Sequence, residues 1–516
     1  MFRPITVFTS VFALLVSSPV AARSMLLDSA TILERTEQVR DSYDYVIVGA
    51  GTAGLTVADR LSEDGKLSNE IIEAGGGRWF SDPGIQFNIT STSQPGMNNR
   101  TQFVWIGCCV GGSSAINGMV MVRGTKVEYD GWAELGRPNS TWDWDGVLPY
   151  FKRVCLRPLC IFTPPEEEIA EAFNITWNPN AWGMEENTRI FASFPEYQNP
   201  WLIPTYQAVK KMPRMDVPLD GAGGDNGLFW FPSSIDPKRY RRSYARTSHY
   251  DGITRSNFEV VTRHKVRKIL FDGTTASGVE FIPRDGDAQP IRVKATKEVI
   301  LAAGAVHTPQ VLQLSGIGPK PLLDEAGIPA LLDIPGVGQN FQDHAYLSVG
   351  YEWGNGTPSG PDVPANGDPS SVAAPNLGAW IGLLTMTPEF EAIASRYEAQ
   401  DPADFLPEGT HPTVVAGYAA FQALHVKLLH DKNRNVMWLP LSGGAGGIVM
   451  AMHIVSHGTI NIDPSDPEGE PVVDYRALSN PVDMDIMIEI VEFMRKYMAS
   501  LDFAEYQPLR RSRGRT

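Results

Sequence analysis

The chain has 516 residues, of which 43% are hydrophobic and 20% are charged. This is the composition of a folded globular protein with room for two or three domains, and it excludes general disorder. The formal net charge of -15 argues against a nucleic-acid partner, because affinity for phosphate backbones depends on clustered Lys and Arg. A small-molecule partner is favoured.

Residues 1–22 are typical of a secretory signal peptide. Arg3 precedes an apolar stretch from Val7 to Val16, and small residues follow at Ala21 and Ala22. The apolar stretch is much shorter than the roughly 20 residues that span a bilayer, so stable membrane association is not expected. Entry into the secretory pathway would make five N-x-S/T asparagines candidate glycosylation acceptors: Asn88, Asn99, Asn139, Asn174 and Asn355.

The chain has four cysteines, which are too few for a disulfide framework and lack the spacing of a metal site. No metal site is predicted, and the neighbouring Cys108 and Cys109 are expected to remain thiols. A bridge between Cys155 and Cys160 requires Cα atoms within about 7 Å, so that pairing stays open.

The first predicted element is a strand over Tyr43–Val48, followed by a glycine turn and an amphipathic helix over 55–61. Gly49, Gly51 and Gly54 have the G-x-G-x-x-G spacing of a dinucleotide site. Glycines there allow a tight turn, admit a pyrophosphate to the backbone and let the helix pack on the strand. The helix N-terminus favours an anion without a basic side chain.

Glu73 lies about 20 residues after this turn and follows the strand end Ile71-Ile72. A carboxylate at this spacing accepts the hydroxyls of an adenosine ribose and repels a 2′-phosphate, which disfavours NADP. The pattern predicts a Rossmann-like domain, and it does not separate NAD from FAD.

Later elements follow the same kind of pattern. Val299–Ala303 is expected to be a buried strand that breaks at Gly304 and leads into a helix, with Pro309 in its first turn. Residues 352–412, rich in Gly, Pro and Asp, are expected to form long loops. Pro481–Met498 is expected to be a core-facing helix capped by Asn480.

Four blocks of sequence, in this order, resemble the signatures of the glucose-methanol-choline (GMC) oxidoreductases: residues 107–130, 304–318, 334–344 and 456–475. The likeness is greatest to fungal aryl-alcohol oxidase-like dehydrogenases, and it extends from about residue 43 to about 500. The resemblance implies a mixed α/β (α+β) fold. It would combine a Rossmann-like FAD-binding domain with a substrate-binding domain built on an antiparallel sheet.

The resemblance also implies a division of the chain. Residues 42–350 would form mainly the FAD-binding domain, with substrate-domain segments inserted at about 140–225. Residues 351–480 would form mainly the substrate-binding domain. Residues 481–516 would form a helix and an atypical tail.

FAD contacts are carried over from the family by position. The adenosine and pyrophosphate contacts would be Gly49, Gly51, Thr52, Ala53, Gly54, Glu73, Ala74 and Val266. The flavin side would be contacted by Gly111, Gly112, Ser113, Asn117, Gly118, Met119 and Val120. Some family members attach FAD through a histidine at the position of Ile116, so noncovalent FAD is expected here.

The implied activity is oxidation of a primary alcohol, aromatic or of secondary metabolism, with hydride passing to flavin N5. Oxygen or a quinone would be the electron acceptor, and the protein would be a monomer or homodimer. Two alternatives stay open: an FAD-containing hydroxynitrile lyase, and a truncated FAD-binding remnant without catalysis.

The catalytic residue is not identified. The resemblance implies a histidine base in an H-P-x-G-T block after Met498, and the nine histidines of the chain all precede that residue. His411 is expected to be a loop residue, and His307 and His344 to be structural polar residues in turns. An incorrect gene model, a pseudoenzyme and a base recruited from elsewhere all explain this, and the unusual segment 154–161 and the arginine-rich tail favour the first.

Overall fold

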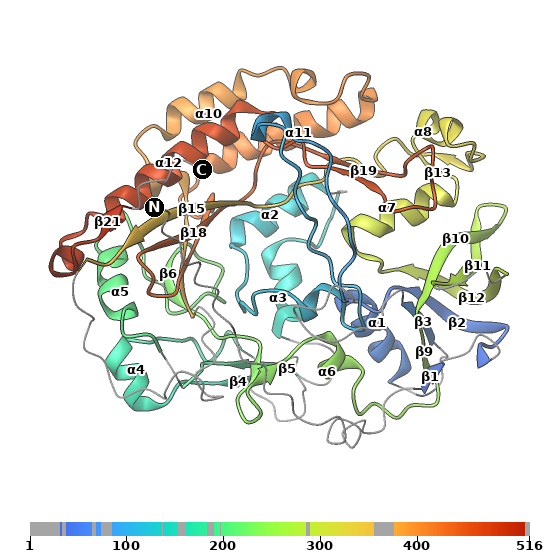
Figure 1. Ribbon diagram of the computed structural model, residues 1–516, viewed down its shortest axis with the longest axis horizontal. Helices are drawn as coiled ribbons and strands as arrows, with labels where there is room; N and C mark the ends of the chain where they lie inside the picture. Colours follow the sequence, from blue (N-terminus) through green and yellow to red (C-terminus); the bar gives the residue numbers. More distant parts are fainter. Residues whose placement is uncertain are drawn as a thin grey trace, which may run out of the picture.

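The computed structural model of the protein describes residues 31–33, 38–63, 65, 69–73, 85–136, 138–152, 160–182, 190–196, 198–284, 289–354 and 376–510. The predicted signal peptide, Ala74, Cys155 and Asn355 lie outside the described residues. A seven-stranded sheet lies on one side of the molecule and a six-stranded sheet on the other (Figure 1). No helix in the described ranges combines the length and the apolar character needed to cross a bilayer.

The seven-stranded sheet has the order β1-β9-β3-β2-β12-β11-β10. Its strands are β1 (Thr31–Leu33), β2 (Ser42–Val48), β3 (Asn69–Glu73), β9 (Phe258–Thr262), β10 (His264–Asp272), β11 (Thr275–Pro283) and β12 (Ile291–Leu301). Strands β1, β9, β3, β2 and β12 are parallel, and the hairpin β10–β11 joins β12 in antiparallel pairing. Helix α1 (Thr52–Ser62) packs Leu55 and Ala58 against Ile47 of the sheet. The predicted strand, turn and helix are confirmed.

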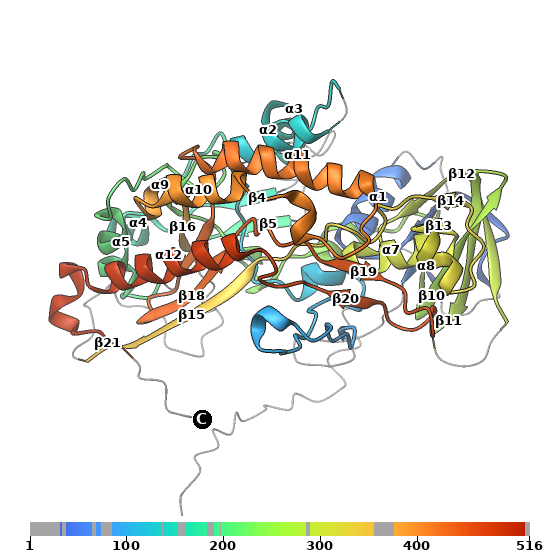
Figure 2. The ribbon, with the colours of Figure 1, turned by 90° about the horizontal axis from the view of Figure 1, so that it is seen from above.

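The six-stranded sheet is antiparallel, with the order β21-β15-β18-β17-β16-β6. Its strands are β6 (Gly227–Trp230), β15 (Ala345–Glu352), β16 (Leu377–Ile381), β17 (Met437–Leu441), β18 (Gly446–Ala451) and β21 (Leu509–Arg510). Helices α10 (Phe390–Glu398), α11 (Pro412–Leu429) and α12 (Pro481–Met498) lie along one side of this sheet (Figure 2). The expected combination of a Rossmann-like sheet and an antiparallel sheet is confirmed, whereas the residue boundaries of the two domains stay predictions.

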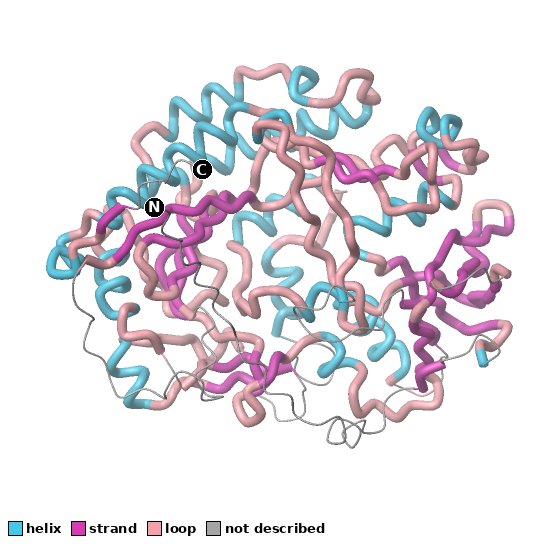
Figure 3. The backbone as a smooth tube through the Cα atoms, viewed as in Figure 1, coloured by secondary structure: helices cyan, strands magenta, loops and turns pink. Residues whose placement is uncertain are grey.

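Short helices and strands joined by loops make up the rest of the described chain (Figure 3). The helices are α2 (Lys126–Leu135), α3 (Trp144–Lys152), α4 (Glu167–Phe173), α5 (Leu202–Lys210), α6 (Ala245–His249), α7 (Gly304–Leu314), α8 (Lys320–Glu325) and α9 (Leu383–Met386). The 3-10 turns are η3 (Pro95–Met97), η4 (Gly112–Ala115), η6 (Pro402–Phe405) and η7 (Leu501–Tyr506). The short strand pairs are β4 (Cys160–Thr163) with β5 (Ile190–Ser193), β7 (Ile235–Asp236) with β8 (Arg241–Arg242), β13 (Ile317–Gly318) with β14 (Leu332–Asp333), and β19 (Thr459–Asn461) with β20 (Val472–Asp474).

Helix α12 has the predicted bounds and the predicted cap. The Asn480 side chain accepts a hydrogen bond from the Val482 N–H at 3.0 Å. Ile490 and Met494 are buried in the largest core cluster, which also contains Val449 of the antiparallel sheet. The helix therefore covers the apolar face of that sheet.

Two expectations about local structure were wrong. Residues 352–412 are not loops throughout, because the Gly- and Pro-rich stretch ends before β16, whose apolar residues are all buried and paired on both sides. Pro309 lies in the interior of α7, since Gly304, with φ +81°, already begins the helix. His411 is a loop residue, as expected: it directly precedes α11 as its N-cap, and its Nδ1 accepts from the Thr413 N–H at 3.3 Å.

Candidate functional site

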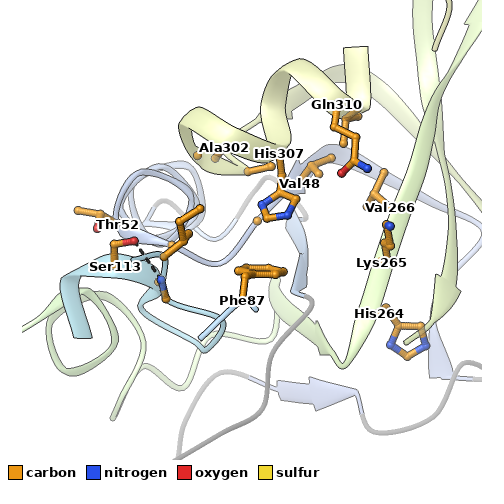
Figure 4. A pocket seen from close by; sticks show the side chains of 18 of the residues that line it. Val48, Thr52, Phe87, Ser113, His264, Lys265, Val266, Ala302, His307 and Gln310 are labelled. Carbon is orange, nitrogen blue, oxygen red and sulfur yellow. Dashed lines mark hydrogen bonds between the residues drawn. The ribbon is translucent and has the colours of Figure 1, made fainter. Parts of the chain in front are cut away.

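A cavity of about 250 Å³ opens beyond the carboxyl ends of the adjacent parallel strands β2 and β12 (Figure 4). Val48 ends β2, and Ala302 and Ala303 follow β12 directly. Ligands of open α/β sheets bind outside the carboxyl ends of their strands, where the loops leave a crevice. We call this space the cofactor cavity.

The first wall of the cofactor cavity is the predicted glycine turn. Gly49 has φ +104°, and a Cβ there would lie 2.5 Å from the Ala302 carbonyl oxygen. A Cβ on Gly54 would lie 1.9 Å from the Gly49 carbonyl oxygen. Both positions therefore require glycine, and α1 begins at Thr52 with its unpaired N–H groups at the cavity.

A second glycine turn, at Gly111 and Gly112, packs directly against the first. Both residues have positive φ, and a Cβ on Gly112 would lie 2.8 Å from the Gly51 Cα. The Gly111 N–H donates to the Ala50 carbonyl at 2.8 Å, and the Gly107 N–H donates to Ser113 Oγ at 3.2 Å. Two turns in contact, both without side chains, let a bulky flat ligand approach the backbone closely. This fits a dinucleotide such as FAD.

The cofactor cavity contains six of the predicted contact residues: Gly49, Gly51, Thr52, Gly112, Ser113 and Val266. Gly54 and Gly111 are buried behind its walls, and Ala53 is exposed in the first turn of α1. Glu73 ends β3, opposite Thr262 of β9.

The segment Asn117 to Val120 does not line the cofactor cavity. Asn117 Oδ1 accepts from Arg242 Nη1 at 2.6 Å and from the Met119 N–H at 3.0 Å. Met119 has φ +60°, and Val120 forms a bridge with Ser233. These predicted flavin contacts therefore lie on the segment between η4 and α2, apart from the adenosine end. The assignment of individual FAD contacts stays a prediction.

Charged side chains complete the opposite wall of the cofactor cavity. Lys265 and Arg284 line it, and His307 Nε2 lies 3.0 Å from Glu470 Oε2. Burial opposes ionisation of Glu470, but the His307 hydrogen bond and the neighbouring cations lower its pKa. Figure 4 shows His307 and Phe87 side by side at the cavity, and their ring centres are 4.2 Å apart.

His307 is thus a satisfied polar residue, as expected, although it lies in helix α7 rather than in a turn.

The two cysteines that precede the second glycine turn, Cys108 and Cys109, are buried. The Cys108 sulfur accepts from Arg284 Nη1, and the Cys109 thiol lies 3.9 Å from the Gly112 carbonyl.

A second cavity, of about 430 Å³, lies between α2, α11 and the segment that follows β18. Three histidines line it, His344, His425 and His453, so we call it the histidine cavity. Its lining also includes Glu128, Trp132, Phe421, Arg434 and Met452.

The floor of the histidine cavity is a buried charged cluster around Glu128. This residue belongs to the capping box of α2, in which its side chain accepts from the Thr125 N–H at 3.1 Å. Its Oε1 lies 2.9 Å from His453 Nε2 and 3.5 Å from Arg434 Nη1, and its Oε2 accepts from Asn435 Nδ2 at 3.0 Å. A buried carboxylate with this many donors is held in one orientation.

The electrostatics of this cluster keep its histidines neutral. Burial and the nearby Arg434 lower the pKa of His453 and lower that of His425 further, well below its usual value. Burial opposes ionisation of Glu128, but His453 and Arg434 lower its pKa. A neutral imidazole whose Nε2 donates to a carboxylate keeps Nδ1 free of a proton, as in the orienting arrangement of a general base.

An aromatic cluster lies between this cavity and the predicted flavin-contacting segment. Phe229, Phe231, Trp380 and Trp438 form it, and Val120, Val122 and Met452 pack against it. Met452 also lines the histidine cavity. One side of the aromatic cluster is therefore shared with the flavin-contacting segment and another with the histidine cavity.

His457 is buried beside the histidine cavity, between Tyr418 and Phe421, with ring centres 4.7 and 4.5 Å away. It lines a neighbouring cavity of about 350 Å³ that shares Phe421 and Asn340 with the histidine cavity. Its Nε2 has no hydrogen-bond partner among the described residues. Burial and Arg476 lower the pKa of His457 to about 4.

Sequence reasoning missed the Glu128–His453 pair. The Thr125-x-x-Glu128 pattern is that of an ordinary capping box, and nothing local marks His453, which lies in the left-handed region with φ +53°. The pairing of residues 325 positions apart arises only from the tertiary structure, because α2 packs against α11 and the end of β18 lies beside both.

Taken together, the fold and the glycine-built cavity define a dinucleotide-dependent enzyme. The family model described as GMC oxidoreductase matches residues 43–346. Dehydrogenase xptC of Emericella nidulans is 34% identical over 514 residues, covering 93% of this chain and 80% of that protein.

Two solved structures are similar over most of the chain. An FAD-dependent oxidoreductase from Chaetomium thermophilum has a TM-score of 0.84 and 33% identity, covering 92% of this chain and 85% of that one. A fungal aryl-alcohol oxidase has a TM-score of 0.83 and 32% identity, covering 92% and 86%. The chain belongs to the GMC oxidoreductase family. Its cofactor is FAD, and it is an oxidoreductase that acts on the CH–OH group of a small-molecule alcohol.

Proposed function

We propose that the protein oxidises a primary alcohol that carries an aromatic or similarly bulky skeleton, of the kind found in secondary metabolism. The histidine cavity supports this proposal. Its volume of about 430 Å³ exceeds the roughly 150 Å³ that accepts benzene, and Trp132 and Phe421 line it. Bound FAD supplies the acceptor for the hydride that leaves the alcohol carbon.

His453 is the candidate acceptor of the hydroxyl proton in this proposal. Alcohol oxidation removes one hydride and one proton, and the proton requires a base. His453 is neutral, and Glu128 holds its Nε2 at 2.9 Å, which leaves Nδ1 as the basic atom. The base is thereby recruited from the segment after β18.

The test measures flavin reduction by single alcohols under anaerobic conditions. We expect substituted benzylic alcohols to bleach the flavin absorbance and to yield the aldehyde, and small aliphatic alcohols to do so much more slowly. His453→Gln should lower the rate by about 10² to 10⁴ with unchanged flavin content. His411→Gln is the matched control, because His411 is an exposed helix cap.

The pH profile adds an independent readout. Because the pKa of His453 is lowered, the wild-type rate should persist below pH 6.5 and fall only in more acidic solution.

Flavin that no alcohol reduces would contradict the proposal. Cyanide release from an aromatic cyanohydrin without bleaching would favour a lyase. Oxygen and a soluble quinone are compared as reoxidants of the reduced enzyme.

FAD is proposed to be bound without a covalent link. The position used for attachment in some relatives is Ile116, an apolar residue that directly follows η4. Acid precipitation should release all flavin into the supernatant. Flavin that stays with the precipitated chain would contradict this.

A further inference from the structure

Residues 85–107 form a hairpin, the cavity hairpin, whose two arms cross the middle of the molecule in blue (Figure 1). Gln86 pairs with Gly107 and Thr90 pairs with Phe103, both antiparallel. The Phe87 N–H donates to the Ile106 carbonyl at 3.1 Å, and the Val104 N–H donates to the Ile89 carbonyl at 2.9 Å. This register places Asn88 directly opposite Trp105.

The two faces of the cavity hairpin differ because side chains alternate along each arm. Phe87 and Ile106 line the cofactor cavity, and Ile89 and Val104 are buried with Val306 of α7. The other face points to solvent.

The solvent face carries a pair of aromatic rings. Trp105 is 70% exposed and Phe103 is 37% exposed, and their ring centres are 5.1 Å apart in an edge-to-face arrangement. Asn88 and Thr90 are exposed on this same face, directly across from those two rings. Directly opposite residues have Cβ atoms about 4.5 to 5.5 Å apart, well within reach of a tryptophan ring.

Asn88-Ile89-Thr90 is also an N-x-S/T acceptor. Both of its recognition side chains therefore stand beside exposed aromatic rings. Three other acceptors of the described chain, Asn99, Asn139 and Asn174, are exposed in left-handed turns, with φ of 58°, 65° and 55°. No strand register places a ring opposite any of those three.

We propose that Asn88 carries an N-linked glycan whose first N-acetylglucosamine packs over Trp105. The apolar C–H face of the sugar suits an aromatic ring that is otherwise in water, and its acetamide and hydroxyl groups stay solvated. The inference rests on entry into the secretory pathway, which the N-terminal sequence predicts, and it is independent of the proposed alcohol substrate.

The modification is a group transfer from a lipid-pyrophosphate-linked oligosaccharide donor. The side-chain amide nitrogen of Asn88 forms a bond to C1 of the first sugar, the C1–oxygen bond to the lipid pyrophosphate breaks, and the amide loses one proton. The product covers the solvent face of a hairpin whose other face lines the cofactor cavity.

The test uses the full chain with its own N-terminal segment, secreted from a yeast host. Glycopeptide mass spectrometry should show Asn88 occupied. Thr90→Ala and Asn88→Gln should both remove this glycan, and Thr90→Ser should keep it. An unoccupied Asn88, or a chain that never receives any glycan, would overturn the proposal.

A double-mutant cycle tests the packing on Trp105. Asn88→Gln should lower the Tm by about 2 °C in the wild-type background and should have no further effect once Trp105→Ala is present. Asn174→Gln is the matched control, and its effect should be the same in both backgrounds. Equal effects of Asn88→Gln in the two backgrounds would refute the contact between sugar and ring.

Discussion

The cofactor cavity and the histidine cavity are built by opposite means. The first is shaped by backbone, with Gly49, Gly54 and Gly112 placed where any Cβ would collide. The second is shaped by side chains from distant parts of the chain, with Glu128 meeting His453 and Arg434. A backbone-built site depends on positions that exclude side chains, whereas a side-chain-built site depends on partners that must be present together.

The largest expected effect is in the histidine cavity. Glu128→Ala leaves Arg434 buried without its carboxylate, and breaking a buried ion pair from one side costs about 3 to 5 kcal/mol. Denaturant unfolding measures this loss. The double variant Glu128→Leu with Arg434→Met should recover much of it, because neither charge is then left alone. A double variant no more stable than the single one would contradict this account.

The next effect depends on pH and concerns His457. Its pKa is about 4 in the folded protein and about 6.5 when unfolded, so below pH 6.5 the unfolded chain binds a proton that the folded chain does not. The stabilisation is therefore complete above pH 6.5 and is lost as pH falls to about 4. Between pH 7 and pH 4.5, wild type should lose about 2 to 3 kcal/mol more than His457→Gln. Parallel pH curves for the two proteins would rule this out.

In the cofactor cavity the sharpest change is Gly112→Ala. The added Cβ would lie 2.8 Å from the Gly51 Cα at a residue with φ +52°, so the two turns must separate. We expect FAD affinity to fall by about 100-fold, or roughly 3 kcal/mol at 1.4 kcal/mol per decade. Flavin titration measures it. Gly417→Ala is the matched control, because a Cβ there meets nothing within 4 Å. Equal FAD affinities of the two variants would contradict the view that the packed glycine turns shape the cofactor site.

The smallest expected effect is that of a charge at the same cavity. Lys265→Gln removes a cation from the wall without changing the backbone, so FAD affinity should fall by about 10-fold or less. The loss should shrink as salt is raised, because partly exposed charges are screened. If Lys265→Gln lowered FAD affinity more than Gly112→Ala does, side-chain charge rather than the packed glycine turns would dominate cofactor binding.

The same contrast explains what the sequence could predict. The strand before Gly49, the helix after it and the Asn480 cap of α12 were predicted because each depends on residues within a few positions. The antiparallel sheet came from the family resemblance. The Glu128–His453 pair was not predicted, because it depends on how α2 packs beside the end of β18.

Errors of local structure have a similar origin. The stretch after Leu377 is strand and helix because pairing with β6 and β17 decides it, and a count of Gly and Pro upstream does not report that pairing. Pro309 was placed too early in its helix, because the left-handed Gly304 starts α7 several residues sooner than the proline suggested.

The cavity hairpin also constrains how the chain can change in length. A one-residue shift in an arm exchanges the two faces of a strand, so a single deletion there would turn Trp105 inward and Ile106 toward water. The tip is different, because Asn98 and Asn99 already form a left-handed turn outside the paired arms. Insertions should therefore be tolerated at the tip, whereas a change in the number of residues in either arm should not be.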